Sequence, residues 1–483
     1  RDERRIGSDT RIEVVTEGVL TRRLQNDPSL DNTALVIFDE VHERNVPTDL
    51  GLAFLLDARR ALGSDTRILA MSATAQVDIF RTALADNGTP APLVESDGRM
   101  HPVDVRHVPR QRNDRLENAV SDCVMTALRD DDGDILVFLP GIGEINRAAD
   151  VLRQRVPANV AVHRLAGALP FAEQDAALSP SDPGHRRIVL STDIAETSLT
   201  VDGVHIVVDA GLARVPRMDV RTGLTEIVTV TSSRASADQR SGRAGRVRPG
   251  VAYRLWSRME DSTRLPHLPA EITQVDLCGP ALEIAAWGTP ADELSLLDPL
   301  PPKSLASAHE TLRMLHLVDD GLKPTSLGRE VLGLPLHPRL GTMVARNKGM
   351  KKQGWIACIV AALLEERDIM RGRPDELPAD LALRVQIVVG LGGHDAADRG
   401  AVRRVFEAAR DIARRARIDS DTHVSSDEID SLTGQVLLAA YPDRLAMARQ
   451  TAGQFLMRNG GGTACNSKDS LAREAFIVAA DID

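Results

Sequence analysis

Short runs of consecutive apolar residues recur along the first half of the chain, and each run ends in polar or small residues. The runs are Ala34–Phe38, Arg67–Met71, Asp134–Leu139, Arg187–Leu190 and His205–Val208. Stretches with helical spacing, such as 50–62 and 144–155, lie between several of them. Apolar strands that alternate with helices are typical of parallel sheets covered on both faces. We therefore predict an α/β fold with two parallel-sheet domains.

The pattern changes twice along the chain. Pro90, Pro92, Gly98 and Pro102 form a turn-rich stretch, which predicts a linker between an α/β block at roughly 1–100 and a second at 101–258. After about residue 259 helical spacing dominates, for example over Leu305–Val318. The glycine-rich segment Asn459–Thr463 lacks the Gly-Lys-Ser/Thr ending of a phosphate loop, so we interpret it as a tight turn between strands.

The composition is that of a globular protein, with 43% hydrophobic and 27% charged residues. The net charge of −10 counts mildly against a nucleic-acid-binding protein. Residues 211–258, however, hold ten arginines and only three acidic residues. This local basic patch suits contacts with backbone phosphates, whereas we interpret the arginines between 403 and 417 as a solvated helix face. Aromatic residues make up only 3% of the chain, which argues against an array of base-stacking side chains.

The remaining compositional signals exclude several classes of protein. The four cysteines, Cys123, Cys278, Cys358 and Cys465, form no C-x-x-C and have no His cluster beside them in sequence. We therefore expect buried thiols in a reducing cytoplasm, with no disulfide framework or zinc site. No run of ~18 apolar residues predicts a membrane span, and no secretory signal opens the chain.

Polar residues collect where the predicted strands end. Asp39-Glu40-Val41-His42, Ser72-Ala73-Thr74, Pro140-Gly141 and Ser191-Thr192-Asp193 each follow an apolar run. In parallel α/β sheets, ligand sites lie outside the carboxyl ends of the strands. Asp39 and Glu40 could hold Mg²⁺ and activate water for phosphoryl transfer. Two solvated acids at a strand end are the simpler alternative, and a Mg²⁺-dependent nuclease is a third.

The segment Gln239–Arg246 (Q-R-S-G-R-A-G-R) carries more information. Ser236 and Gln239 match an S-x-x-Q capping box, which predicts a helix start there. Gln239, Arg243 and Arg246 then share one helical face, and two guanidinium groups on one face suit a polyphosphate. Gly242 and Gly245 weaken a helix by ~1 kcal/mol each, so we expect another backbone or a ligand to approach closely.

Taken in order, these motifs resemble the DEAH-box helicases of superfamily 2. The resemblance also uses Thr16-Glu17-Gly18, Gly167-Ala168-Leu169-Pro170 and the segment Ser191–Thr200. The tail, with Leu334–Leu340 and Ala440–Arg444, looks like the bacterial HrpB-type branch. Val41 stands where the family name has Ala, and Asp193 stands where many members have Asn. The resemblance implies RecA-like domains at 1–100 and 101–258, a winged helix at 259–345, a ratchet-like helical region at 346–432 and a small α+β end region at 433–483.

The resemblance also implies roles for single residues. Asp39 and Glu40 would bind Mg²⁺ and Glu40 would activate water, with His42 coupling the nucleotide site to Ser72 and Thr74. Further ATP contacts would come from Thr200, Asp202, Gln239, Arg243 and Arg246. Gln239 would position water, and the two arginines would act as arginine fingers. The backbone of a single-stranded nucleic acid, which we take to be RNA, would contact Thr16, Gly18, Gly167 and Thr192. Protein partners are not indicated.

One part of the family pattern is missing, because no G-x-x-x-x-G-K-[ST] loop occurs anywhere in the 483 residues. That loop cradles the β- and γ-phosphates of ATP. Together with the first residue being Arg1, this leads us to read the sequence as a piece of a longer helicase. The alternative is a catalytically incomplete protein that binds nucleic acid or serves as a scaffold.

Overall fold

The computed structural model describes most of the chain. The described residues are 7, 9–73, 77–86, 88–96, 101–111, 113–167, 169–181, 184–196, 199–219, 224–366, 368–372, 376–458 and 460–480. Residues named above that lie outside this set are Arg1, Thr74, Gly98, Ala168, Asn459 and, within the motif Ser191–Thr200, Thr197 and Ser198; Arg221, one of the ten arginines of 211–258, also lies outside it. None of the helices formed by the described residues is long and apolar enough to cross a membrane.

The N-terminal part is built on two parallel strands. Its elements are α1 (Glu17–Asn26), β1 (Leu35–Phe38), η1 (Val41–Glu43), α2 (Val46–Leu62), β2 (Arg67–Ala70) and α3 (Asp78–Ala83). Alternate side chains of β1 point to opposite faces: Val36 and Phe38 are buried, whereas Leu35 and Ile37 are about half exposed. α2 is capped by the Asn45 side chain, which accepts the Thr48 backbone N–H at 2.9 Å.

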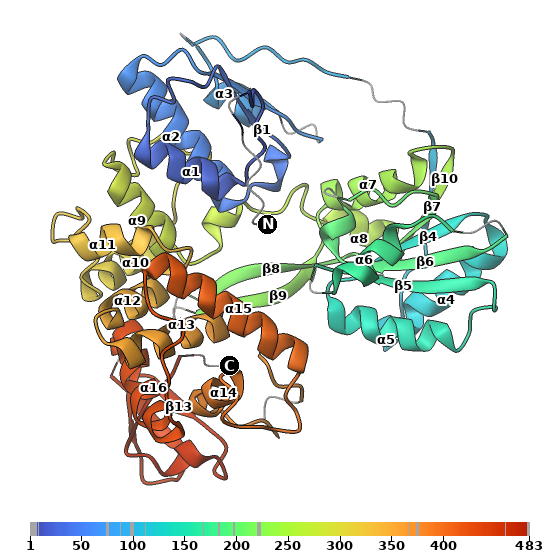
Figure 1. Cartoon of the computed structure of the whole chain (residues 1–483). Helices are drawn as coiled ribbons and strands as arrows, with labels where there is room; N and C mark the ends of the chain where they lie inside the picture. Colours follow the sequence, from blue (N-terminus) through green and yellow to red (C-terminus); the bar gives the residue numbers. More distant parts are fainter. Residues whose placement is uncertain are drawn as a thin grey trace.

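The second part contains a six-stranded, all-parallel sheet in the order β3-β10-β7-β4-β6-β5 (Figure 1). Its strands are β3 (Val103–His107), β4 (Asp134–Phe138), β5 (Val160–Leu165), β6 (Arg186–Ser191), β7 (Val204–Asp209) and β10 (Gly250–Arg254). The other elements are α4 (Leu116–Asp130), α5 (Ile142–Arg153), α6 (Phe171–Leu178), η2 (Asp193–Ala195), β8 (Leu212–Asp219), β9 (Leu224–Thr231), α7 (Arg234–Gly242) and η3 (Arg243–Gly245).

Both faces of this sheet are buried, as the continuous apolar runs predict. On β4, Ile135 and Val137 pack on the side covered by α4 and α5. Leu136 and Phe138 pack on the opposite side, against Ala177 of α6 and Ala244 of η3. The antiparallel hairpin β8–β9 leaves this domain, and the Met218 N–H donates to the Gln274 carbonyl of the following region at 2.7 Å.

The remainder of the chain is mostly helical and ends in a small antiparallel sheet, β13-β12-β11-β14. The helices are α8 (Arg258–Thr263), η4 (Glu271–Thr273), α9 (Cys278–Trp287), α10 (Pro302–Met314), α11 (Ser326–Leu332), α12 (Pro338–Asn347), α13 (Lys351–Glu365), α14 (Leu381–Val388), α15 (Arg399–Ala416), α16 (Ser426–Ala440), η6 (Pro442–Arg444) and η7 (Ser470–Arg473). The strands are β11 (Leu445–Ala448), β12 (Gln454–Met457), β13 (Gly462–Ala464) and β14 (Phe476–Val478).

The hydrophobic core of the N-terminal part continues into the first helices of the C-terminal region. Leu24 and Phe38 belong to the same buried cluster as Leu282 and Leu312. The Phe54 ring stacks on Trp287, with ring centroids 4.7 Å apart. The second sheet, in contrast, has separate clusters on its two faces. The N-terminal part and α9–α11 are therefore joined by apolar packing, whereas the second domain has a core of its own.

Most elements expected from the sequence are confirmed. Each of the five apolar runs overlaps a strand of a parallel sheet, and the region after residue 259 is mostly helical. The turn expected before Thr463 is present at Gly460, which joins β12 to β13 with φ +87°. The helix start expected at Ser236 is wrong, because Ser233 is the N-cap of α7 and accepts the Ser236 N–H. The boundaries proposed for the five regions stay predictions.

Candidate functional site

A cleft lies between the N-terminal part and the second domain. Its volume is about 500 Å³. The N-terminal part contributes His42, Glu43 and Asn45 to the lining, and the second domain contributes residues that include Glu196 and Gln239. Segments more than 150 residues apart in sequence thus share one concave surface, which mixes apolar and polar side chains.

The turn after β1 carries the predicted acidic pair. The Asp39 carboxylate accepts the backbone N–H of Glu40 at 2.9 Å, and the Val41 N–H donates to the Met71 carbonyl at 3.0 Å. Glu40 has φ +51°, a left-handed conformation that is uncommon for a residue other than glycine. Such conformations are held in place by their surroundings and cluster at functional sites.

His42 connects three groups around this turn. Its Nδ1 lies 3.4 Å from Glu40 Oε2 and 3.4 Å from the backbone nitrogen of Ala73, the residue that follows Ser72. Burial raises the pKa of the Glu40 carboxyl, which Asp39 and Glu43 raise further, while His42 and Arg243 act in the opposite direction.

The most direct contact across the cleft joins His42 to Gln239. The Nε2 atoms of the two side chains are 3.4 Å apart. The amide nitrogen of Gln239 is a hydrogen-bond donor and faces His42 Nε2, while His42 Nδ1 accepts the Ala73 backbone N–H. Because Ser233 caps α7, Gln239 has no capping role and reaches the N-terminal part instead.

Arg243 and Arg246 follow on the same segment, but α7 ends at Gly242 and continues as the 3₁₀ turn η3. Arg243 donates to the backbone carbonyls of Leu199, at 2.8 Å, and Glu196. Arg246 donates to the Thr200 hydroxyl at 2.8 Å. No carboxylate of the described residues lies within ion-pair distance of either guanidinium. Burial, with Arg246 nearby, lowers the pKa of Arg243 to about 10.

Another part of the backbone approaches Gly245 closely, as expected for this glycine. A Cβ at this position would lie 2.5 Å from the His101 carbonyl oxygen. The Gly245 carbonyl also accepts the His101 N–H at 2.8 Å. The glycine therefore lets the start of the second domain pass directly beneath the arginine segment.

The sequence reasoning missed Arg240, the most buried arginine of this segment. Its guanidinium donates to Glu196 Oε2 at 2.7 Å and to Asp209 Oδ1 at 3.0 Å, and it lies over the Phe138 ring. These bonds tie α7 to β7 and to the segment that carries Thr200. Both residues belong to the same arginine-rich motif, so the sequence does not indicate that Arg240 is buried whereas Arg246 is exposed.

The remaining predicted residues fall into separate places. Thr192 is the N-cap of η2, and its N–H donates to the Leu165 carbonyl at 3.3 Å. A Cβ on Gly167 would lie 3.8 Å from Ile194, so these two loops are neighbours.

Asp202 is exposed and its backbone carbonyl accepts from Arg187. Thr16 caps α1, and Gly18 lines another cavity, shared with α9 and α11. Gly18 is thus not brought to the Gln239 cleft.

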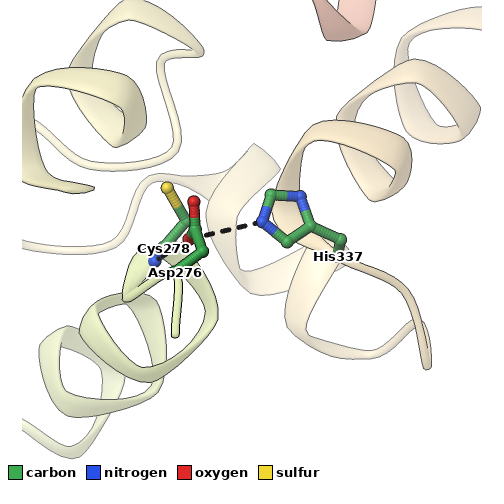
Figure 2. Close-up of side chains that lie close together, drawn as sticks. All are labelled: Asp276, Cys278 and His337. Atoms are coloured by element: carbon green, nitrogen blue, oxygen red, sulfur yellow. Dashed lines mark hydrogen bonds and ion pairs between the residues drawn. The ribbon is translucent and has the colours of Figure 1, made fainter. Parts of the chain in front are cut away.

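A second polar group, Asp276, Cys278 and His337, joins α9 to α12 (Figure 2). His337 Nε2 lies 3.5 Å from Asp276 Oδ1, and its Nδ1 accepts the Arg339 backbone N–H at 3.3 Å. The ring proton is therefore on Nε2, directed at the carboxylate. Metal-bound histidines usually donate from their second nitrogen, so this geometry fits a hydrogen-bonded bridge. The sequence spacing gave no sign that His337 approaches Cys278.

Comparisons with known proteins agree with this architecture. The helicase conserved C-terminal domain matches residues 115–248. The chain is 37% identical over 477 residues to the ATP-dependent RNA helicase HrpB of Escherichia coli, covering 98% of this chain and 55% of the relative. It is 31% identical over 382 residues to the pre-mRNA-splicing factor ATP-dependent RNA helicase prp22 of Schizosaccharomyces pombe, covering 77% and 32%.

Two solved structures have the same fold. The crystal structure of the E. coli DExH-box NTPase HrpB matches with a TM-score of 0.82 and 35% identity, over 100% of this chain and 56% of that chain. A second structure, of the E. coli DEAH/RHA helicase HrpB, matches with a TM-score of 0.83 and 36% identity, over 99% and 57%.

The chain therefore belongs to the DEAH-box helicases of superfamily 2, and the α/β prediction with RecA-like domains is confirmed. Within this family its similarity is to the HrpB type. The chain spans about half the length of the E. coli relative it matches.

Proposed function

We propose that this chain forms the greater part of an ATP-dependent helicase motor that moves along single-stranded RNA in the cytoplasm. The observation that carries the proposal is the contact across the cleft between His42 and Gln239, at 3.4 Å. It brings the acidic turn after β1 and the arginine segment after α7 to one site. The named activities of the relatives, both ATP-dependent RNA helicases, support the same function.

The residues present fit a magnesium nucleotide. Arg243 and Arg246 follow the cleft residue Gln239 in sequence and carry two positive charges without an ion pair to a described carboxylate, which suits a triphosphate. Asp39 and Glu40, in the turn that also carries His42, would offer the oxygen ligands that Mg²⁺ prefers. When bound, Mg²⁺ neutralises charge on the phosphate oxygens. Thr200 and Asp202 complete the proposed nucleotide contacts.

The steps of hydrolysis are divided among these side chains. Glu40 accepts a proton from the attacking water, and a carboxyl with a raised pKa is a better base near neutral pH than an exposed one. Gln239 orients that water, and His42 holds both Glu40 and Gln239 in place. Arg243 and Arg246 stabilise the charge that develops on the transferred phosphoryl group.

Coupling to RNA follows from the contacts of His42 and of the strand-end loops. His42 reaches Ala73, so a change at the nucleotide is passed to Ser72 and, in our proposal, to Thr74. Thr192 and Gly167, on neighbouring loops, contact the RNA backbone, as do Thr16 and Gly18. Contacts to the backbone alone let the strand slide without sequence preference.

The test is the variant Glu40→Gln in a full-length form of the protein. We expect RNA-stimulated ATP hydrolysis to be lost while nucleotide binding survives. Unchanged turnover contradicts the proposal. ATP titration of the 483-residue chain distinguishes the helicase from the scaffold alternative. Tight binding and hydrolysis of ATP by this chain would exclude a non-catalytic protein.

A further inference from the structure

Phe171 is the most exposed aromatic side chain of the protein. Its relative exposure is 82%, and the only other exposed phenylalanine, tryptophan or tyrosine is Phe476, at 59%. All the aromatic residues lie in the described part of the chain. An isolated exposed apolar side chain needs no functional explanation by itself, so its position decides what it can do.

The backbone holds the Phe171 ring in a defined place. It is the first residue of α6, directly after Pro170, whose ring restricts the chain at the helix start. The Gln174 side chain donates to the Leu169 carbonyl at 2.8 Å and closes the turn. Leu169 packs against the core of the second sheet. The ring thus stands on an anchored turn, which lowers the entropy lost when it binds a partner.

The turn lies beside the interdomain cleft. Gly167, at the start of the turn, is a neighbour of Ile194, because a Cβ on this glycine would lie 3.8 Å from Ile194 Cδ1. Ile194 and Asp193 line the cleft that contains His42 and Gln239. A path of adjacent loops therefore leads from the cleft to the Phe171 ring, along the carboxyl ends of β6 and β5.

We propose that Phe171 stacks on one base of the single-stranded RNA whose backbone contacts Gly167 and Thr192. This inference rests on the proposed function and extends it from the backbone to a base. An exposed phenylalanine offers an apolar, aromatic face but no hydrogen-bond donor, so it suits a base face and cannot bind a phosphate. Every base has such a face, and the contact therefore adds affinity without sequence preference.

The test is RNA binding by the 483-residue chain, measured by fluorescence anisotropy with a labelled single-stranded oligouridylate. Phe171→Ala and Phe171→Leu both remove the aromatic face, and leucine keeps the apolar bulk. We expect each to weaken binding about 5- to 100-fold, the loss of one base–aromatic stack. Phe171→Trp restores binding. Phe476→Ala is the matched control, since it removes an exposed ring on β14, and it leaves the affinity unchanged.

Abasic oligonucleotides identify the partner of the ring. Removing single bases in turn should weaken binding by wild type at one position, and Phe171→Ala should be insensitive to that change. Equal losses in both proteins, or wild-type affinity for Phe171→Ala or Phe171→Leu, overturn the stack while the proposed function stands. That result would instead indicate that Phe171 contacts another protein. Absence of RNA binding by wild type itself overturns the proposed function and this inference together.

Discussion

The Nε2 atoms of His42 and Gln239 lie 3.4 Å apart although the two residues are 197 positions apart in sequence. This contact predicts that the two side chains act together. Replacing Gln239 with Ala should lower RNA-stimulated ATP turnover of the full-length protein about 10- to 100-fold, because the attacking water loses its orientation. His42→Ala should cost about as much, and the double variant little more. Steady-state kinetics check this, with the exposed Gln154→Ala as control. Fully additive losses contradict the coupling.

Arg243 carries a charge with no carboxylate partner among the described residues, and this predicts a large catalytic effect. Arg243→Ala should reduce the hydrolysis rate by roughly 10³- to 10⁵-fold if its proposed role is that of an arginine finger. Arg243→Lys should recover little, since lysine cannot donate to two acceptors in one plane. Single-turnover hydrolysis is the measurement. Arg248→Ala, at an exposed arginine close by, should leave the rate within about twofold, and an equal loss there refutes a specific role for Arg243.

Arg240 predicts an effect on stability. Its guanidinium is 2% exposed and bonded to Glu196 and Asp209. Arg240→Ala leaves two buried carboxylates without their partner and should lower the free energy of unfolding by about 3–5 kcal/mol. Urea denaturation measures the change. Arg403→Ala breaks an exposed pair with Glu407, and we expect less than ~0.5 kcal/mol there. Similar losses for both variants are not compatible with an internal role for Arg240.

Glu283, on α9 at the cavity shared with α1, predicts a pH-dependent stability. Burial raises the pKa of Glu283 to about 7, and Arg22 only partly opposes this. The folded state therefore binds a proton that the unfolded state releases, so stability falls as the pH rises from about 4.5 through 7. Glu283→Gln removes this penalty and should stabilise the protein by roughly 1–3 kcal/mol at pH 8 but hardly at pH 4.

Thermal unfolding at both pH values tests the Glu283 prediction. Glu330→Gln, at a carboxylate that is paired with Lys348 on the surface, serves as a control with the same chemical change. A gain in melting temperature that is equal at pH 4 and pH 8 contradicts the titration of Glu283.

The sheet of the second domain could be predicted because its inner strands β4, β6 and β7 are buried on both faces. Runs such as Asp134–Phe138 are apolar at every position between polar ends, and this pattern is specific to covered parallel strands. The exact start of α7 could not be predicted from the sequence. Three serines, Ser232, Ser233 and Ser236, all suit an N-cap. Tertiary contacts decide between them: the N–H groups of Arg234 and Ala235 donate to the carbonyls of Leu265 and Pro266.

The candidate site was predictable in its residue types but not in its pairing. The order of motifs alone pointed to Glu40, His42, Gln239 and Arg243. No spacing rule, however, distinguishes Arg240, which faces the interior, from Arg246, which reaches Thr200. The α-helix becomes a 3₁₀ turn at Arg243, so the directions of the side chains depart from a single helical face. Nor does sequence spacing bring His337 to Asp276.

The stack of Phe54 on Trp287 has a mechanical consequence. Because the two rings lie in one apolar cluster that runs from α1 and α2 into α9 and α10, we expect these elements to move as one rigid body. The described residues bridge the cleft to the second domain through polar contacts such as His42–Gln239. We therefore predict that a movement between the two domains leaves the distance between spin labels on α2 and α10 unchanged but alters the distance between labels on α2 and α5.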